Sequence, residues 1–253
     1  DGGQDRQLRA IFHKPGLYPF TLNVKDIAGN EASVAREVSV YGRDGFSSFS
    51  DSILESYWTL ENIGPRANDL GDGWYSLRDQ PGALLVHVLH GGRSRPLTGS
   101  DPQYAAFLRD VPGTTDWYFQ TKLGLRTQSH GDFHTGLFVE TVESGQLHRY
   151  FFGLDSGTKL SVLSLSTGNP ETLKSSSFMQ DEAILRVKHL SGTLSFEWKD
   201  SGEWKNIHSV TLPGNSETVH TGLHLANPDN WQTVGVAFDY AMLIDPSLVS
   251  PYR

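Results

Sequence analysis

Hydrophobic and polar residues alternate with a period of two along much of the chain, as expected for β-strands that bury one face. The segment 117–123 divides into Trp117, Phe119, Thr121 and Leu123 on one face and Tyr118, Gln120 and Lys122 on the other. In 183–188, the pattern predicts that Leu185 and Val187 are buried and that Arg186 and Lys188 are exposed. At least one sheet is therefore expected to have a polar, solvated face.

A third segment, 193–199, follows the same rule. Its predicted buried residues are Leu194, Phe196 and Trp198, and its predicted exposed residues are Ser195, Glu197 and Lys199. Turn residues such as Asp155-Ser-Gly, Ser191-Gly and Asp200-Ser-Gly separate the runs. The predicted strands after the first 43 residues are 74–77, 83–89, 105–110, 117–125, 134–143, 148–155, 160–165, 183–189, 193–199, 220–226 and 234–243. Eleven or so strands without helices predict a two-sheet sandwich.

The first 43 residues contain two further strand-like runs, 17–24 and 32–40, around a turn at 26–31. Val34, Val38 and Val40 are candidates for burial. Because two strands alone are marginal in water, this hairpin is expected to need more sheet. Residues 41–45 have the composition of a linker.

Composition narrows the class of protein. The chain has 253 residues, 37% hydrophobic and 20% charged, which is enough for a packed core. The absence of cysteine excludes thiol catalysis, disulfides and thiolate metal sites. A net charge of −8 argues against nucleic acid as a partner. No apolar run is long enough for a membrane span, and no signal peptide is found, so we expect a piece of a longer protein.

Two resemblances extend these expectations. The stretch Pro15-Gly-Leu-Tyr-Pro-Phe-Thr-Leu-Asn-Val-Lys-Asp-Ile-Ala-Gly-Asn resembles the second half of a PKD or bacterial Ig-like repeat. This resemblance implies that residues 1–43 are the C-terminal part of such a domain, whose first half is missing. Residues 44–253 would then form the main body.

The main body resembles the concanavalin A-like β-sandwich found at the C-terminus of family 43 glycoside hydrolases and in bacterial accessory modules. The matching stretches begin at Asp51, Trp74, Thr135, His148, Ile184, Phe196 and Val236, and together they span nearly all of residues 46–245. The resemblance implies an all-β, concanavalin A-like two-sheet jelly roll. It does not specify a ligand, because such sandwiches host many functions.

The function that this resemblance implies is a non-catalytic carbohydrate-binding or accessory module of an extracellular protein, secreted or displayed at the cell surface. Its partners would be a xylan-like or other plant-type polysaccharide and other modules of the same parent chain. A glycoside hydrolase or polysaccharide lyase is the alternative from another class, and a structural, adhesin-like spacer is the second alternative.

Aromatic and basic residues supply the candidate ligand-binding set, because sugar rings stack on aromatic rings and arginine binds carboxylates and hydroxyls. Trp74 and Trp117 lie near strand starts, Tyr118 lies on the polar face of its strand, and Trp231 lies in a polar loop. Arg93 and Arg95 flank a flexible glycine pair, where an acidic sugar is conceivable. Arg149 follows Gln146 and His148 in a string that hints at a lyase.

Two places are candidates for metal binding. Members of the superfamily often hold a structural Ca²⁺ between the first and last strands, and the matching positions here are Asp51 and Asp239, with Asp44 as a helper. His130, Asp132 and His134 have a spacing that would place three metal ligands on one strand face, but a loop leading into Thr135 is the favoured interpretation of this segment.

The glutamates do not form a catalytic pair by spacing. A retaining glucanase needs two carboxylates about 5 Å apart. Glu197 and Asp200 fall on opposite faces of a predicted strand, and so do Glu140 and Glu143. The sequence therefore predicts no catalytic residue.

Overall fold

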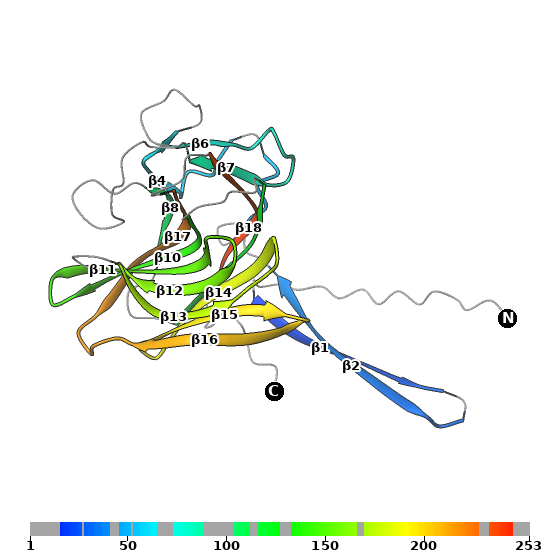
Figure 1. The fold of residues 1–253 in the computed structure, drawn as a ribbon. Helices are drawn as coiled ribbons and strands as arrows, with labels where there is room; N and C mark the ends of the chain where they lie inside the picture. Colours follow the sequence, from blue (N-terminus) through cyan, green and yellow to red (C-terminus); the bar gives the residue numbers. More distant parts are fainter. Residues whose placement is uncertain are drawn as a thin grey trace.

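The structure is a computed structural model that describes residues 16–26, 28–40, 46–51, 53–64, 73–88, 104–111, 116–126, 133–165, 170–227 and 233–244. These residues form eighteen strands and no helix, arranged in a two-stranded, a seven-stranded and a nine-stranded sheet (Figure 1). Across these ranges, no helix has the length and apolar character needed to cross a membrane. The predicted all-β sandwich is confirmed.

The seven-stranded sheet is antiparallel throughout. Its spatial order is β13 (Glu171–Ser177), β12 (Lys159–Ser164), β11 (Gln146–Asp155), β10 (His134–Glu143), β17 (Glu217–Ala226), β8 (Tyr104–Asp110) and β4 (Thr59–Glu61). The β10–β17 pair joins residues far apart in sequence, for example Leu137 and Leu223. Such non-local pairing fixes which side chains share a face.

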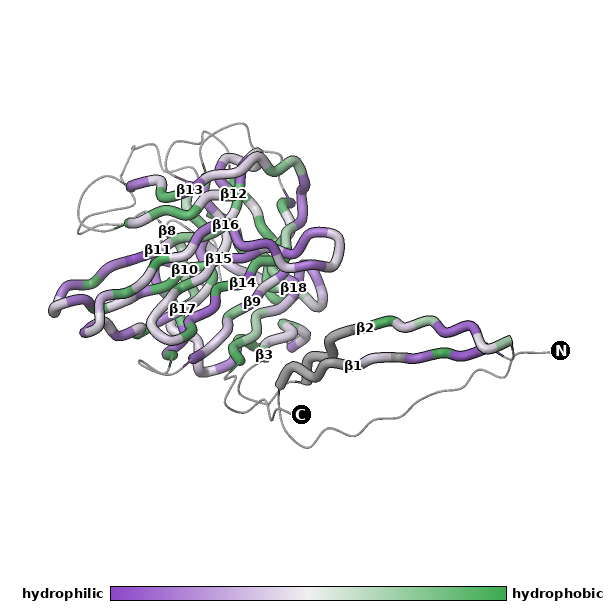
Figure 2. The backbone as a smooth tube through the Cα atoms, turned by 90° about the horizontal axis from the view of Figure 1, so that it is seen from below, coloured by the Kyte–Doolittle hydropathy of each residue, from purple (hydrophilic) through white to green (hydrophobic). Residues whose placement is uncertain are grey.

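The nine-stranded sheet lies against it. Its order is β16 (Glu203–Thr211), β15 (Thr193–Asp200), β14 (Glu182–Leu190), β9 (Trp117–Leu125), β18 (Val234–Ile244), β7 (Leu84–Val88), β6 (Gly73–Ser76) and β5 (Ile63–Gly64), with β3 (Phe46–Ser47) paired to β18. Figure 2 shows β16, β15, β14, β9 and β18 side by side.

Serine–glycine pairs form the tight turns. In the β14–β15 hairpin, Ser191 and Gly192 have φ values of 48° and 75°, and in the β15–β16 hairpin Ser201 and Gly202 have 51° and 93°. Two consecutive residues with positive φ match the twist of the flanking strands in a two-residue hairpin. The predicted turns at these two positions are confirmed.

One core fills the space between the two large sheets. Its largest fully buried side chains include Trp117, Phe119, Phe152 and Phe196, each 0% exposed. Burying one such side chain contributes roughly 1.5–3 kcal/mol. The alternation predicted for β9 is confirmed, since Trp117, Phe119, Thr121 and Leu123 are buried and the residues between them are only half-buried.

The predicted strands of the main body are all present, with ends that differ by at most three residues. The short strands β3, β4 and β5 were not predicted, nor were β13 and β16. β13 has the sequence Glu-Thr-Leu-Lys-Ser-Ser-Ser and is almost entirely exposed. Without a buried face it has no alternation for the sequence pattern to detect.

Three burial predictions on β14 and β15 are wrong. Arg186 and Glu197 were expected in solvent but are only 8% and 6% exposed, because they form an ion pair across the two strands. Trp198 was expected to be fully in the core but is only half-buried, packed against the rim of the core beside Phe178.

The two-stranded sheet is a hairpin of β1 (Gly16–Lys25) and β2 (Glu31–Val40), as predicted, and it projects from the sandwich in Figures 1 and 2. At its turn the Asp26 carboxylate accepts hydrogen bonds from the Asn30 side chain and from the backbone of Asn30 and Ala28, and these bonds lower its pKa. Val34 was expected to be buried but is 47% exposed. Among the described residues the hairpin pairs only with itself, so that valine has no second layer to pack against.

Candidate functional site

Four charged side chains form a row across the outer face of the seven-stranded sheet. Strand register places Arg149 beside Glu140, Glu140 beside His220, and His220 beside Asp110. Arg149 Nε lies 2.8 Å from Glu140 Oε1, and His220 Nδ1 lies 2.7 Å from Glu140 Oε2. His220 Nε2 lies 3.3 Å from Asp110 Oδ1. We call these four residues the ionic row.

Exposure increases from Glu140 to Asp110 in the ionic row. The Glu140 side chain is 4% exposed, whereas those of His220 and Asp110 are 37% and 94% exposed. Because a carboxylate on one ring nitrogen orients a histidine, His220 Nε2 is the atom of the row best placed to exchange a proton with a bound molecule.

Beside the ionic row, this outer face carries buried apolar side chains. Leu108, Phe138, Phe151 and Leu163 form a buried cluster next to the ionic row. The His224 ring lies against Phe138 and Phe151, with ring centroids 5.5 and 5.2 Å away. Burial, with smaller contributions from the charges of His134 and Arg149, lowers the pKa of His224 to about 3. This imidazole therefore stays neutral and belongs to the packing.

The outer face of the nine-stranded sheet has a different character. Arg186 donates to Glu197 Oε2 through Nε at 2.9 Å and through an η nitrogen at 2.6 Å. Lys188 Nζ lies 2.5 Å from the other oxygen, Glu197 Oε1. One buried carboxylate thus holds two cations in fixed positions.

Two aromatic rings flank Arg186. The guanidinium carbon lies 3.9 Å from the ring centroid of Trp204 on β16 and 5.7 Å from that of Tyr118 on β9. The ammonium of Lys199 lies 5.5 Å from the same Trp204 ring. We call Tyr118, Arg186, Lys188, Glu197, Lys199 and Trp204 the Arg186 patch.

A third half-buried aromatic ring lies on β6, farther along this sheet. Leu84, Val86 and Val88 of β7 point into the core, so His87 and its strand partner Trp74 lie on the outer face. The two rings stack at 4.1 Å with an interplanar angle of 16°. Burial lowers the pKa of His87, which favours a neutral ring against the indole.

The predicted ligand-binding residues do not form one site. Trp117 is fully buried, and its Nε1 donates to Thr218 at 3.1 Å, so its expected role in sugar stacking is corrected to a core role. Tyr118 and Trp74 lie on the outer face of the nine-stranded sheet, whereas Arg149 lies on the other sheet in the ionic row. Arg93, Arg95 and Trp231 lie outside the described residues.

The calcium prediction stays a prediction. Asp51 is exposed, Asp239 Oδ2 lies 2.9 Å from Lys122 Nζ, and Asp44 lies outside the described residues. Within the described ranges no group of three or more acidic or histidine side chains has metal-binding geometry. The Lys122 ammonium therefore competes with a cation for the Asp239 carboxylate.

The alternative metal triad is described only at His134, whose Nε2 lies 3.6 Å from Asp155 Oδ1. Its predicted partners His130 and Asp132 lie outside the described ranges.

The described glutamates give no retaining pair. Glu143 accepts a hydrogen bond from the Tyr150 hydroxyl, and Tyr150 faces the core, whereas Glu140 pairs with Arg149 on the opposite face. The same alternation separates Arg149 from Tyr150, so the string that hinted at a lyase does not converge.

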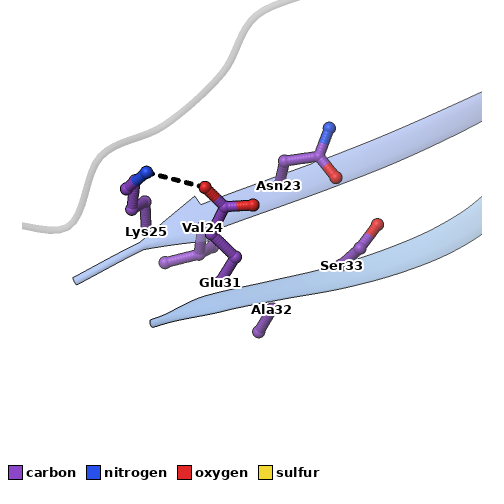
Figure 3. Close-up of a pocket in the computed structure, with 6 residues that line it drawn as sticks. All are labelled: Asn23, Val24, Lys25, Glu31, Ala32 and Ser33. Carbon is purple, nitrogen blue, oxygen red and sulfur yellow. Dashed lines mark hydrogen bonds and ion pairs between the residues drawn. The ribbon is translucent and has the colours of Figure 1, made fainter. Parts of the chain in front are cut away.

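A hollow of about 440 Å³ lies beside the tip of the hairpin (Figure 3). Its lining includes Val24 and the ion pair between Lys25 and Glu31, at 2.8 Å, with both side chains well exposed. The described residues that line it include no aromatic ring, so they offer a sugar no stacking surface.

Pattern reasoning missed Glu140, His220, Asp110, Arg186, Glu197 and Trp204 as site residues. Each is a polar or aromatic residue on the outer face of its strand, and the alternation of hydrophobic and polar positions indicates that face. Their partners come from strands up to 110 residues away, counted from Asp110 to His220, and only the register brings them together.

Comparison with known proteins shows the fold alone. No protein-family model matches the chain, and no curated protein matches it in sequence. Three similar solved structures are the GH43 protein BlXynB from Bacillus licheniformis, a xylan β-1,4-xylosidase from Bacillus halodurans and GH43B of a Bacteroides ovatus xyloglucan locus. Their TM-scores are 0.58, 0.57 and 0.56 at 15%, 15% and 14% identity. The matches cover 88%, 87% and 88% of this chain but only 46%, 45% and 46% of those proteins.

Proposed function

We propose that this chain is a non-catalytic carbohydrate-binding or accessory module that holds a polysaccharide by aromatic stacking. The observation that carries the proposal is the set of rings on the outer face of the nine-stranded sheet. Trp74, Tyr118 and Trp204 come from three strands, and none of them belongs to the core. Rigid rings of this kind offer a large contact area to an apolar sugar face at low entropic cost.

The proposed ligand is a xylan-like or other plant-type polysaccharide. The similar folds within proteins named for xylan and xyloglucan support this choice. Single modules of this kind bind weakly, and tethering to other modules makes the binding useful by raising the effective concentration. The other modules of the parent chain are therefore the proposed partners.

We place the parent protein outside the cell, secreted or at the cell surface. Residues 1–43 would be the end of a PKD or Ig-like spacer, and residues 44–253 the sandwich. The hairpin β1–β2 supports this division, since it forms a sheet of its own. A structural Ca²⁺ at Asp51, Asp239 and Asp44 is part of the proposal, and a melting temperature that a chelator lowers and Ca²⁺ restores is its test.

A polysaccharide panel assayed for retention and for product formation tests the proposed function. We expect retention without product, and weaker retention for Trp74→Ala and Trp204→Ala. Tyr150→Phe is the matched control, because that ring packs against Phe196 between the sheets. Turnover would contradict the non-catalytic proposal, and neither binding nor turnover would favour a structural spacer.

The ionic row favours an enzyme as the second candidate. His220, oriented by Glu140, would abstract a proton from a bound sugar, with Arg149 beside the same carboxylate, as a polysaccharide lyase requires. The test is ultraviolet absorbance of an unsaturated product from any panel member. A signal that His220→Ala abolishes and Tyr150→Phe, between the sheets, leaves intact would support it.

A further inference from the structure

Positive charge is concentrated on the Arg186 patch in a chain of net charge −8. Arg186, Lys188 and Lys199 contribute three positive charges and Glu197 one negative charge, which leaves +2. The neighbouring cations contribute no further excess, since Lys205 pairs with Asp200 and Lys122 lies between two carboxylates, those of Glu182 and Asp239. The excess charge is therefore local to the patch.

The patch also holds its cations beside aromatic rings. Glu197 fixes Arg186 through two nitrogens, and the Trp204 ring lies over the guanidinium at 3.9 Å. Fixed cations lose little conformational entropy when an anion binds, which favours a defined site over loose attraction. An anion that carries a ring would meet charge and a stacking surface together.

Small polar side chains continue the same face. Strand register places Ser195 beside Lys188 and Asn206 beside Glu197. The hydroxyl oxygens of Ser195 and Ser209 lie 3.1 Å apart, and Asn206 Nδ2 donates to Ser209 at 2.9 Å. These exposed groups exchange hydrogen bonds readily and suit the hydroxyls of a sugar.

We propose that the Arg186 patch binds an anionic polysaccharide, with acidic groups near Lys188 and Lys199 and sugar rings near Trp204 and Tyr118. The proposal rests on the proposed function and names its ligand class. Carboxylated and sulfated sugars share the required chemistry. A phosphate backbone fits less well, because a patch with a net charge of +2 on an acidic chain carries too little positive charge to bind nucleic acid.

The test compares polygalacturonate with its methyl-esterified form, a pair that differs only in carboxylate charge. We expect the whole chain to bind the charged polymer about tenfold more tightly, with a preference that salt weakens. Dextran sulfate serves as the sulfate arm. Tighter binding of that polymer than of polygalacturonate would assign a sulfated ligand, and the reverse a carboxylated one.

Paired variants locate the site. Lys188→Gln with Lys199→Gln should remove most of the preference, roughly tenfold in affinity, and Trp204→Ala should weaken binding by a similar factor. Lys205→Gln is the control, since it also removes one positive charge but lies beside Trp198 at the rim of the core. An unchanged preference in the double variant, an equal loss in the control, or equally tight binding of oligouridylate would overturn the proposal.

The outcomes separate this inference from the proposed function. Binding of neutral glycans without a preference for charge would leave the carbohydrate-binding module standing and overturn the anionic ligand. No binding to any glycan would overturn both.

Discussion

The two large sheets expose outer faces of opposite character. On the seven-stranded sheet, Phe138 and Phe151 are fully buried and the Glu140 carboxylate is paired with both Arg149 and His220. On the nine-stranded sheet, Trp74, Tyr118 and Trp204 are half-buried, and the charges of the Arg186 patch sum to +2. A face that is already packed stabilises the fold, whereas a face with rings and unbalanced charge is suited to a ligand.

The difference also shows what a buried ion pair does in each place. Glu140 and Glu197 are 3% and 6% exposed, and each is contacted by two basic side chains. Glu140 joins three strands next to an apolar cluster, while Glu197 holds Arg186 beneath an indole and pairs with Lys188. The same chemistry is structural in one sheet and part of the proposed binding surface in the other.

The largest expected effect comes from disrupting the packed outer face of the seven-stranded sheet. Phe138→Ala removes a fully buried ring and should lower the free energy of unfolding by about 3–5 kcal/mol. Trp204→Ala is the comparison on the other face and should lower it by only about 1 kcal/mol, the loss of one cation–π contact. Chemical denaturation measures both, and equal losses would show that the two faces do not differ in this way.

A smaller effect is expected in the ionic row. Glu140→Gln leaves Arg149 and His220 without their shared carboxylate and should lower the free energy of unfolding by roughly 1–3 kcal/mol. Glycan binding should not change. Asp110→Asn, at the exposed end of the row, should change stability by less than about 0.5 kcal/mol. Loss of binding in Glu140→Gln at unchanged stability would assign the ligand to the seven-stranded sheet instead.

A further effect appears only in acid. The pKa of His224 is about 3 in the folded chain against an ordinary value of 6.5, so the unfolded chain binds more protons between these values. Stability should therefore fall as the pH is lowered from about 6.5 towards 3. In His224→Phe this contribution disappears, and the fall in denaturation midpoint between neutral and acidic pH should be smaller than in the wild-type chain. An identical pH dependence in both chains would show that His224 is not the titrating group.

Much of the fold could be predicted from the sequence. The alternation in 117–123 fixed the faces of β9, and the Ser-Gly pairs fixed two hairpin turns. β13 escaped prediction because an exposed edge strand has no hydrophobic period. Arg186 and Glu197 escaped because a charged residue is expected in solvent unless its partner across the strands is known.

The site was less predictable than the fold. The choice of aromatic residues identified Tyr118 and Trp74 on the outer face, but it also selected Trp117 in the core. Residue type alone does not indicate how deeply a side chain is buried. Trp204 was not predicted as a site residue, and its position over Arg186 depends on the pairing of β14, β15 and β16. Sites assembled from strand register become visible only in the folded chain.

The central claim is that ligand binds the outer face of the nine-stranded sheet, and amide hydrogen exchange with saturating polygalacturonate tests it most directly. We predict slower exchange in β14, β15 and β16, around Arg186, Lys188 and Trp204, and unchanged exchange in β10 and β17. Protection centred on Glu140 and His220, with none on β14–β16, would contradict the account.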